Sequence, residues 1–359
     1  MKMKNMIKRF LAVILALMLL LPCFAAAEEE TTEEDITEEE TGEEETVTEK
    51  DGWYFDAKGF LAGDSNPGEE YLKEDEENGV WRYATKDLSI TVTRYEEKVK
   101  VKSGKRSRVY CVAEVYCTPE SPLFTVTSPR TKENVKKYAG LPGYRISNPE
   151  VLVKNNPVIL AVSDDFYGGR MQKVVDKKAS WPIGVIIRNG ELLNSKTRDG
   201  KKPQWPSLDT LAVFEDGSMK AEPVASKTAE DFVAEKATQV FSFGPWLIHE
   251  GEINVKGVDS SKSYMYNDAQ YSEPRVAVGM VEPFHYILIA VQGRPTSKYI
   301  GVKLDWLADK MKEYGCTEAG NLDGGGTVAM LFNGKTILQG YKDDPRPLGS
   351  MIAFGSKGE

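Results

Sequence analysis

The segment with the clearest capacity for chemistry is a run of three glycines beside an acid. It reads Asn321-Leu322-Asp323-Gly324-Gly325-Gly326-Thr327. Consecutive glycines let a ligand approach the backbone closely, and their N–H groups together form a concave site that suits an anion such as phosphate. Asp323 could serve there as an acid or base, or as a metal ligand. The alternative is a glycine-rich turn that Asp323 caps.

A second candidate segment places adjacent acids after an apolar run. Val158–Val162 is followed by Ser163, Asp164 and Asp165, and then by two aromatic residues and two glycines. Neighbouring side chains on a strand point to opposite faces, so only one of the two acids can address a given site. Aromatic rings beside a carboxylate suit stacking on a sugar. A turn with solvated acids accounts for this segment equally well when it is taken alone.

Three arginines complete the set of candidate groups. Tyr286–Val291 has the pattern of a buried strand, and Arg294 follows just beyond its end. Arg275 precedes this strand and Arg346 lies near the end of the chain. Guanidinium groups form forked hydrogen bonds that match a phosphate, so the three could converge on one anion. Each arginine taken singly is equally compatible with a surface salt bridge.

The sequence indicates neither a metal centre nor an organic cofactor. His249 and His285 are the only histidines, and their separation matches no zinc motif such as HExxH. We expect His285 to be a structural residue. The carboxylates could hold Ca²⁺ or Mg²⁺, but their spacing matches no known metal loop. We therefore predict no cofactor.

The elements that must position these groups are mainly strands. Three dipeptides, each between apolar segments, predict two-residue hairpin turns: Asn189-Gly190, Asp216-Gly217 and Asn333-Gly334. Leu88–Thr93 and Val109–Tyr116 alternate as half-exposed strands do. Val158–Val162 and Tyr286–Val291 are apolar throughout, which predicts strands buried on both faces.

Helices are expected to be fewer. Lys303–Tyr314 has apolar residues at helical spacing and Gly315 should end it, while Thr131–Tyr138 and Ala229–Ala237 fit the pattern less regularly. Residues 51–85 show no periodic element and read as an irregular extension. Strands with interspersed helices predict an α+β fold, built on a mostly antiparallel mixed sheet with a few packed helices.

The first fifty residues have the patterns of processing and spacing segments. Basic residues precede the twelve-residue apolar run Phe10–Leu21, and Ala25–Ala27 follows, which predicts a secretory signal peptide over 1–27. A membrane anchor is the alternative, but this run is shorter than the roughly 18 residues that a spanning helix needs. Residues 28–50 are mostly Glu and Thr and predict a disordered acidic linker. We therefore expect a secreted or extracellular protein, either free or attached to the cell envelope.

Charge and cysteine content exclude two further classes. The net charge of −9 is concentrated in the acidic linker, so the nearly neutral remainder gives no reason to expect nucleic-acid binding. After the signal peptide the chain keeps Cys111, Cys117 and Cys316. Cys111 and Cys117 are too far apart on one strand to bridge each other, and an odd count leaves at least one free thiol. Buried cysteines are expected, not a disulfide scaffold. No later stretch is apolar and long enough to span a bilayer.

Taken together, these segments identify the chain as similar to the phosphodiester glycosidases over roughly residues 105–356. The resemblance rests on five segments in matching order and spacing, namely Val185–Leu192, Phe243–Ile248, Pro274–Gly279, Gln292–Arg294 and Asn321–Thr327. It implies a domain over 105–359, preceded by an N-terminal extension over 51–104. Members release a sugar from a sugar-1-phosphodiester, and bacterial members are secreted or envelope proteins often linked to exopolysaccharide or cell-wall glycans.

The resemblance also implies roles for individual residues. Asp323 and Asp165 match catalytic positions, although their separate roles are not assigned. The positions that match substrate and phosphate binding are Arg275, Arg294, Arg346, Asn321, Gly324, Gly325, Gly326 and Thr327. Two positions depart from the family pattern, because Ser163-Asp164 replaces Asn-Gly and Gln292 replaces an acid. These departures leave open a non-catalytic envelope module that binds anionic, phosphorylated glycans.

Overall fold

A computed structural model describes residues 46–102, 104–127, 144–145, 147–164, 179–180, 184–196, 208–223, 226–254, 271–294, 298–341 and 346–355. Strands dominate these residues, and neighbouring strands in every sheet pair antiparallel. The predicted α+β class with a mostly antiparallel sheet is confirmed. The residues Thr131–Tyr138, one of the expected helices, lie outside the described part.

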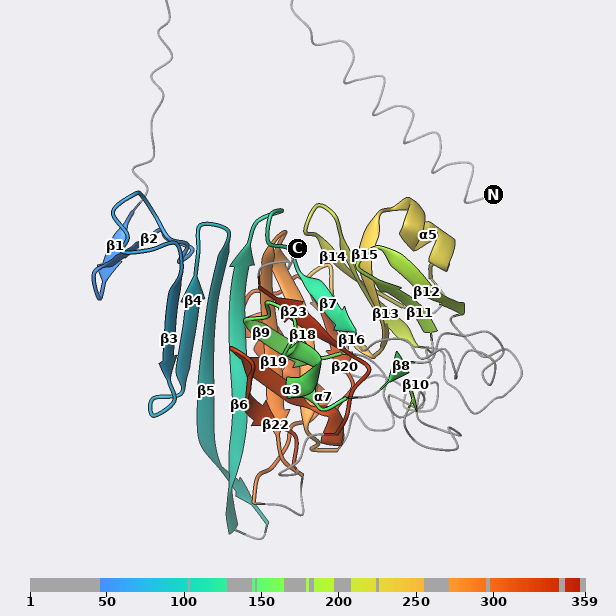
Figure 1. Ribbon diagram of the computed structural model, residues 1–359. Coiled ribbons are helices and arrows are strands. Elements are labelled where there is room, and N and C mark those ends of the chain that lie inside the picture. Colours follow the sequence, from blue (N-terminus) through green and yellow to red (C-terminus); the bar gives the residue numbers. More distant parts are fainter. Residues whose placement is uncertain are drawn as a thin grey trace, which may run out of the picture. The chain divides into compact units, whose positions relative to one another are not determined.

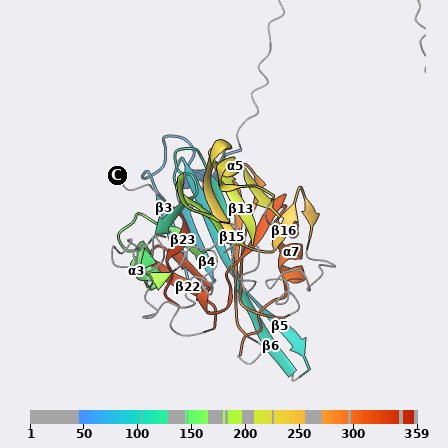
Figure 2. The same ribbon diagram turned by 90° about the vertical axis from the view of Figure 1, so that its right-hand side faces the viewer.

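The largest sheet has nine strands (Figure 1). Its long hairpin reaches beyond the neighbouring strands (Figure 2). In spatial order the strands are β17 (Glu252–Ile253), β16 (Trp246–His249), β20 (Glu318–Leu322), β18 (Arg275–Glu282), β19 (His285–Gln292), β6 (Gly104–Cys117), β5 (Leu88–Val101), β4 (Val80–Ala84) and β3 (Tyr71–Asp75). The hairpin is formed by β5 and β6, which are both 14 residues long.

Two five-stranded sheets pack against this large sheet. One has the order β12 (Glu191–Lys196), β11 (Gly184–Arg188), β15 (Ala237–Phe243), β13 (Asp209–Phe214) and β14 (Met219–Glu222). The other has the order β22 (Lys335–Gln339), β21 (Ala329–Phe332), β9 (Leu160–Ser163), β23 (Ser350–Phe354) and β7 (Phe124–Thr127). Two short pairs complete the strands, β1 (Thr48–Lys50) with β2 (Trp53–Phe55), and β8 (Tyr144–Arg145) with β10 (Ala179–Ser180).

The core explains why β19 is apolar at every position from Tyr286 to Val291. Tyr286, Leu288 and Ala290 face a hydrophobic cluster shared by all three large sheets. Ile287 and Ile289 face a second cluster, on the side of the nine-stranded sheet that α7 (Leu304–Glu313) covers. Each fully buried Leu or Ile side chain contributes about 1.5–3 kcal/mol of transfer free energy. Burial on both faces, predicted for Tyr286–Val291, is therefore confirmed.

The helices agree in part with the prediction. The helix α7 lies within Lys303–Tyr314 as expected. The helix α5 (Ala229–Ala234) begins with a capping box between Thr228 and Asp231, and it ends early because Lys236 adopts a φ of 63° before β15. The five-residue helix α3 (Pro149–Val153) was not predicted, since it is too short to show a period.

Two of the three predicted hairpin turns are confirmed. Asn189-Gly190 and Asn333-Gly334 have positive φ at both positions, as a two-residue type I′ turn requires. The two-residue turn predicted at Asp216-Gly217 is wrong. Only Gly217 has a positive φ, and the N–H of Phe214 donates to the carbonyl of Ser218, so the loop contains three residues. Such a loop is a type I turn followed by a left-handed glycine.

Residues 51–85, where the sequence shows no period, contain β2, β3 and β4. In β4 one face packs on the core through Trp81 and Tyr83, while Arg82 lies on the other face. The strand β3 is at the edge of the sheet, and most of its side chains are only partly buried. The strand β1 takes the last residues of the segment 28–50, and it pairs with β2 across a turn at Asp51-Gly52. Residues 45–359 form one compact unit.

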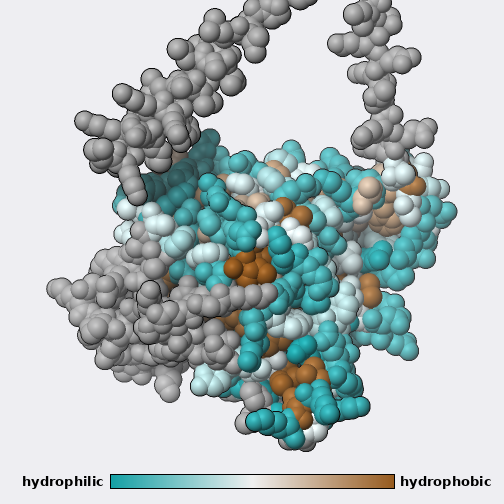
Figure 3. Space-filling view, turned by 180° about the vertical axis from the view of Figure 1, so that it is seen from behind, coloured by the Kyte–Doolittle hydropathy of each residue, from teal (hydrophilic) through white to brown (hydrophobic). Residues whose placement is uncertain are grey.

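The three cysteines form no disulfide. Cys111, Cys117 and Cys316 are free and buried, as expected, and burial raises the pKa of each thiol to about 12. Among the described helices, none is long and apolar enough to cross a membrane. Exposed apolar side chains are scattered over separate elements, and the face in Figure 3 is mostly hydrophilic with small apolar patches.

His285 has the structural role expected for it, and its partner gives a pH prediction. Its Nε2 lies 3.0 Å from Glu114 Oε1, and its ring stacks on Tyr116 at 3.9 Å. The hydrogen bond from His285 holds the pKa of Glu114 below its ordinary value of 4.5. A lowered folded-state pKa stabilises the fold above the unfolded pKa, and this stabilisation is lost as the pH falls through the folded pKa.

We therefore expect Glu114→Gln to lower the free energy of unfolding at pH 7, by an amount that shrinks below about pH 4.5. Denaturant titrations of wild type and variant at pH values from 3 to 8 measure this difference. The exposed substitution Glu69→Gln is the matched control. A difference that is the same at every pH would contradict the prediction.

Candidate functional site

The ends of strands from two sheets meet at the glycine run. Val276 pairs with Leu322, and Arg275 with Val291, so the start of β18 and the ends of β19 and β20 share one edge. The residues after β20 then cross to β21 in a five-stranded sheet. There β9 ends beside the start of β23. The N–H of Asp323 donates to the carbonyl of Asp164 at 3.1 Å, which joins the two edges.

Close packing makes glycine necessary in this turn. Gly325 has a φ of 67°, a conformation that side chains disfavour. A Cβ on Gly324 would lie 2.4 Å from the carbonyl oxygen of Pro274, and one on Gly340 would lie 2.0 Å from that of Gly325. The N–H of Gly325 donates to Pro274 at 2.9 Å. Because that amide is occupied, an anion site would rest on the amides of Gly324 and Gly326.

We expect Gly325→Ala to cost about 1–2 kcal/mol in the free energy of unfolding, because an alanine is strained at this φ. The new Cβ would also lie 3.0 Å from Arg294 Nη2 and displace that group. Denaturant titration measures the stability. Gly334→Ala is the matched control, since its φ is 76° and its Cβ would meet nothing within 4 Å. Any activity should fall only in Gly325→Ala, and equal activity in both variants would contradict this.

Two of the three predicted arginines flank the glycine turn. The guanidinium of Arg294 stacks over the ring of Tyr341 at 4.2 Å, and its Nε lies 3.1 Å from Glu273 Oε2. A Cβ on Gly326 would lie 3.2 Å from Arg346 Nη2 and 3.4 Å from the Tyr341 hydroxyl. Two guanidinium groups and a phenol thus border the same backbone. This arrangement suits a phosphate, because guanidinium forks match phosphate oxygens.

Arg275 is placed differently. It is buried, and it donates to the backbone carbonyls of Val302 at 3.5 Å and Tyr271 at 3.2 Å. These bonds hold the loop before β18 against the residues that precede α7. Pro274, which directly precedes Arg275, packs against Gly324. The described contacts of Arg275 therefore support the backbone that packs against the glycine turn.

Of the two predicted catalytic acids, the structure describes Asp323 but not Asp165. Asp323 is half-buried at the start of the turn. Asp165 lies outside the described residues. Its neighbour Asp164 is buried, lies 3.3 Å from Arg188 Nη2, and accepts a hydrogen bond from the Ser350 hydroxyl. The carboxylate of Asp164 is thus paired with Arg188. Its contact with the glycine turn is made by its backbone carbonyl, which accepts the N–H of Asp323 and so positions that residue.

Arg188 connects β11 with β15 and with Asp164 at the end of β9. It extends from β11, donates to the carbonyl of Val240 at 2.6 Å and lies 4.4 Å above the ring of Phe241. Sequence reasoning did not identify the Asp164–Arg188 pair, nor Tyr341 and Glu273 beside Arg294. None of these residues lies in a local pattern that signals its partner, because the partners come from distant segments.

Asn321 and Thr327 use their side chains to shape the backbone. Asn321 Nδ2 donates to the carbonyl of Gly244 at 2.8 Å, and Thr327 donates its hydroxyl to the carbonyl of Gly324. Both side chains are almost fully buried. The Oδ1 of Asn321 has no hydrogen-bond partner among the described residues. The described contacts therefore leave Asn321 Oδ1 able to accept a hydrogen bond from a ligand or water.

Neither histidine lies near the glycine turn. His285 is at the other end of β19 from Gln292, which places it roughly 20 Å or more from the turn. His249 Nδ1 lies 3.1 Å from Glu318 Oε2, at the opposite end of β20 from Asp323. In the described part of the chain, no three His, Cys, Asp or Glu residues group closely enough to hold a metal ion.

Comparison with known proteins gives a family match and a distant relative. Residues 156–355 match the phosphodiester glycosidase family. The SPbeta prophage-derived uncharacterized protein YomE of Bacillus subtilis (strain 168) is 24% identical over 155 residues, which are 42% of this chain and 23% of that protein. The chain therefore spans about a quarter of this relative's length.

One solved structure shares the fold of this chain. The catalytic domain of zebrafish N-acetylglucosamine-1-phosphodiester alpha-N-acetylglucosaminidase, described as auto-inhibited by its pro-peptide, aligns with a TM-score of 0.57 and 16% identity. The alignment covers 81% of this chain and 90% of that domain. A hypothetical protein from Synechocystis aligns with a TM-score of 0.45 and 12% identity, over 81% and 69% of the two chains.

Proposed function

We propose that this chain, which belongs to the phosphodiester glycosidase family, is a hydrolase that releases a sugar from a sugar-1-phosphodiester. The observation that carries the proposal is the meeting of Asp323, Arg294 and Arg346 at one glycine turn. A carboxylate and two guanidinium groups are the types of group that cleavage beside a phosphate requires.

The chemistry follows from the leaving group. A phosphate on the anomeric carbon leaves readily, so the site needs little protonation of the leaving oxygen. Arg294 and Arg346 would stabilise the departing negative charge, with the ring of Tyr341 holding Arg294 in place. Asp323 would activate the attacking water or stabilise the oxocarbenium-like centre. Asp165 is the proposed second acid, and the two roles are not divided between them.

The proposed setting is outside the cell. A signal peptide over 1–27 and an acidic linker over 28–50 would export the domain and hold it away from a surface. The proposed substrates are therefore phosphodiester-linked sugars in envelope or exopolysaccharide glycans. The chain would need no organic cofactor for this reaction.

Sugar release tests the proposal directly. The full chain is incubated with uridine diphosphate N-acetylglucosamine and with a methyl sugar-1-phosphodiester, and free sugar is measured. We expect release by wild type and a kcat/KM lower by about 10- to 100-fold in Arg294→Gln, the value of lost hydrogen bonds to a charged group. Arg106→Gln, on β6, is the matched control and should act as wild type.

A binding module remains the second candidate. The departure at Ser163 favours it, because this side chain, which replaces the family's Asn, is buried and its hydroxyl oxygen accepts the N–H of Ala329. Saturable binding of a phosphorylated glycan, lost in Arg294→Gln, without any sugar release would support this second function. Absence of both release and binding would reject both candidates.

A further inference from the structure

A row of polar side chains lies on the outer strands of the nine-stranded sheet, apart from the glycine turn. Arg82 pairs with Thr91, and Thr91 with Glu114, so three neighbouring strands present these side chains on one face. The opposite face of β4 carries Trp81, which packs in the core. The polar face is thus turned away from the main core.

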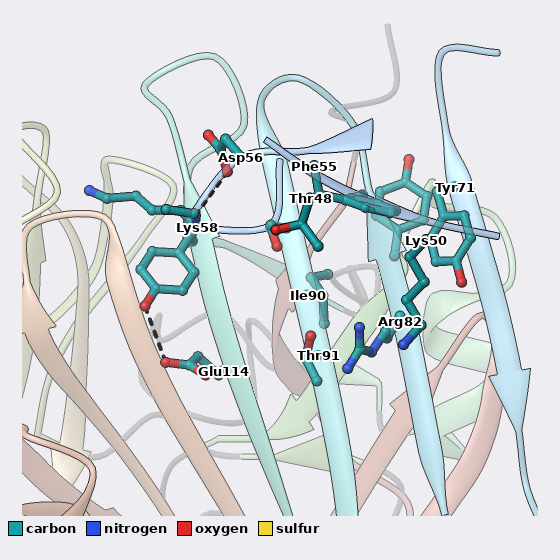
Figure 4. A pocket seen from close by; sticks show the side chains of 16 residues that line it. Thr48, Lys50, Phe55, Asp56, Lys58, Tyr71, Arg82, Ile90, Thr91 and Glu114 are labelled. Atoms are coloured by element: carbon teal, nitrogen blue, oxygen red, sulfur yellow. Dashed lines mark hydrogen bonds between the residues drawn. The ribbon is translucent and has the colours of Figure 1, made fainter. Parts of the chain in front are cut away.

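The segment around β1 and β2 crosses this row and encloses a cavity of about 290 Å³ (Figure 4). The volume is close to the lower limit of roughly 300–1,000 Å³ for small-molecule sites, which suits a ligand of monosaccharide size. The residues that matter for its chemistry are Lys50, Phe55, Tyr71, Arg82, Thr91 and Glu114.

Most charges in the lining are balanced by contacts already present. Lys58 lies 3.2 Å from Glu282, and Asp56 accepts hydrogen bonds from the backbone N–H groups of Lys58 and Phe60 at 2.9 Å. Glu114 is held by His285 at 3.0 Å. These groups need no ligand to satisfy them.

Two cations in the lining are not balanced. Among the described residues neither Lys50 nor Arg82 has an acidic partner, and the buried Nε of Arg82 has no acceptor. Figure 4 shows both side chains extending into the same part of the cavity, next to Thr91. The residue paired with Arg82 on β3 is Lys73, whose Nζ lies 3.2 Å from Asp51 and so adds no unbalanced charge. A positive charge in a partly enclosed site calls for an anion.

Tyr71 supplies an independent sign of a missing partner. Its side chain is only 6% exposed, it lines the cavity, and its hydroxyl has no hydrogen-bond partner among the described residues. The ring of Phe55 lies 5.2 Å from that of Tyr71. The cavity therefore combines an apolar ring, an unused hydroxyl and an unbalanced guanidinium.

We propose that this cavity is a second binding site, for a monosaccharide that carries a carboxylate or a phosphate. Arg82 and Lys50 bind the acid group, Phe55 packs against the ring, and Tyr71 bonds a sugar hydroxyl. The site is separate from the glycine turn. Along β6, Tyr116 at the cavity is seven positions from Val109, which pairs with Gln292, a distance of roughly 20 Å or more. The proposal therefore stands without the proposed hydrolysis.

Calorimetric titration of the full chain tests the site, with glucuronate and glucose 6-phosphate as probes and glucose as the neutral comparison. We expect saturable binding of at least one acidic sugar and none of glucose. Arg82→Gln and Lys50→Gln should each weaken binding about tenfold or more. Arg106→Gln is the matched control, and Arg294→Gln at the glycine turn should bind as wild type.

Each outcome of the titrations either supports the second binding site or overturns it. Lys50 is exposed, so Lys50→Gln reports on binding even where Arg82→Gln fails to fold. Wild-type affinity in Lys50→Gln and in folded Arg82→Gln would overturn the proposal, as would loss of binding in Arg294→Gln. Inorganic phosphate that binds as tightly as both sugars would also overturn it, because the sugar ring would then contribute nothing. Selective binding of one probe identifies the acid group as carboxylate or phosphate.

Discussion

Asp323→Asn is expected to lower the rate of sugar release by about 100-fold or more while leaving the fold intact. An acid or base in direct contact with the reacting atoms contributes about 10²–10⁴ to the rate. The amide keeps the size and shape of the carboxylate but loses its charge. The backbone bond from Asp323 to the carbonyl of Asp164 remains, so the turn keeps its position.

Steady-state kinetics and thermal unfolding of the same preparations measure both parts of this prediction. The loss should appear in kcat, with KM changed little, because Arg294 and Arg346 still bind the phosphate. Asp64→Asn, an exposed position in the N-terminal extension, is the matched control. Turnover at the wild-type rate in Asp323→Asn would remove Asp323 from the mechanism and leave Asp165 as the remaining candidate acid.

Features that depend on short segments could be predicted from the sequence. The turn at Asn333-Gly334 follows from two residues that tolerate positive φ, and α7 follows from the spacing of its apolar residues. The continuous apolar run in β19 predicts burial on both faces, and the structure shows two clusters there. The loop at Asp216-Gly217 is one residue longer than the sequence predicts, because the dipeptide does not determine where the flanking strands stop pairing.

Features that depend on distant segments could not be predicted. The sequence shows Asp323, Arg294 and Arg346 as separate candidates, and only the pairing of strands from two sheets brings them together. Tyr341 follows a short strand and has no neighbour in sequence that signals its contact with Arg294. The strands β3 and β4 show no period in the sequence because each has only five residues, and in β3 each face carries a charged side chain beside an apolar or aromatic one.

Arg188→Met is expected to have the largest effect on stability, lowering the free energy of unfolding by about 3–5 kcal/mol. The substitution removes the cation from a buried pair and leaves Asp164 charged among buried groups. It also removes the donor to the carbonyl of Val240. Denaturant titration with a fixed m-value measures the loss, and Arg106→Met is the matched control. A loss below about 1 kcal/mol would show that the pair is not buried as described.

The double variant Arg188→Met with Asp164→Leu separates stability from function. Replacing both members of a buried pair with apolar residues is often close to neutral, so we expect much of the lost stability to return. Turnover should stay low if the pair also sets the backbone at Asp164, since that carbonyl accepts the N–H of Asp323. Recovery of both stability and turnover would instead show that any apolar packing between β9 and β11 positions the acid equally well.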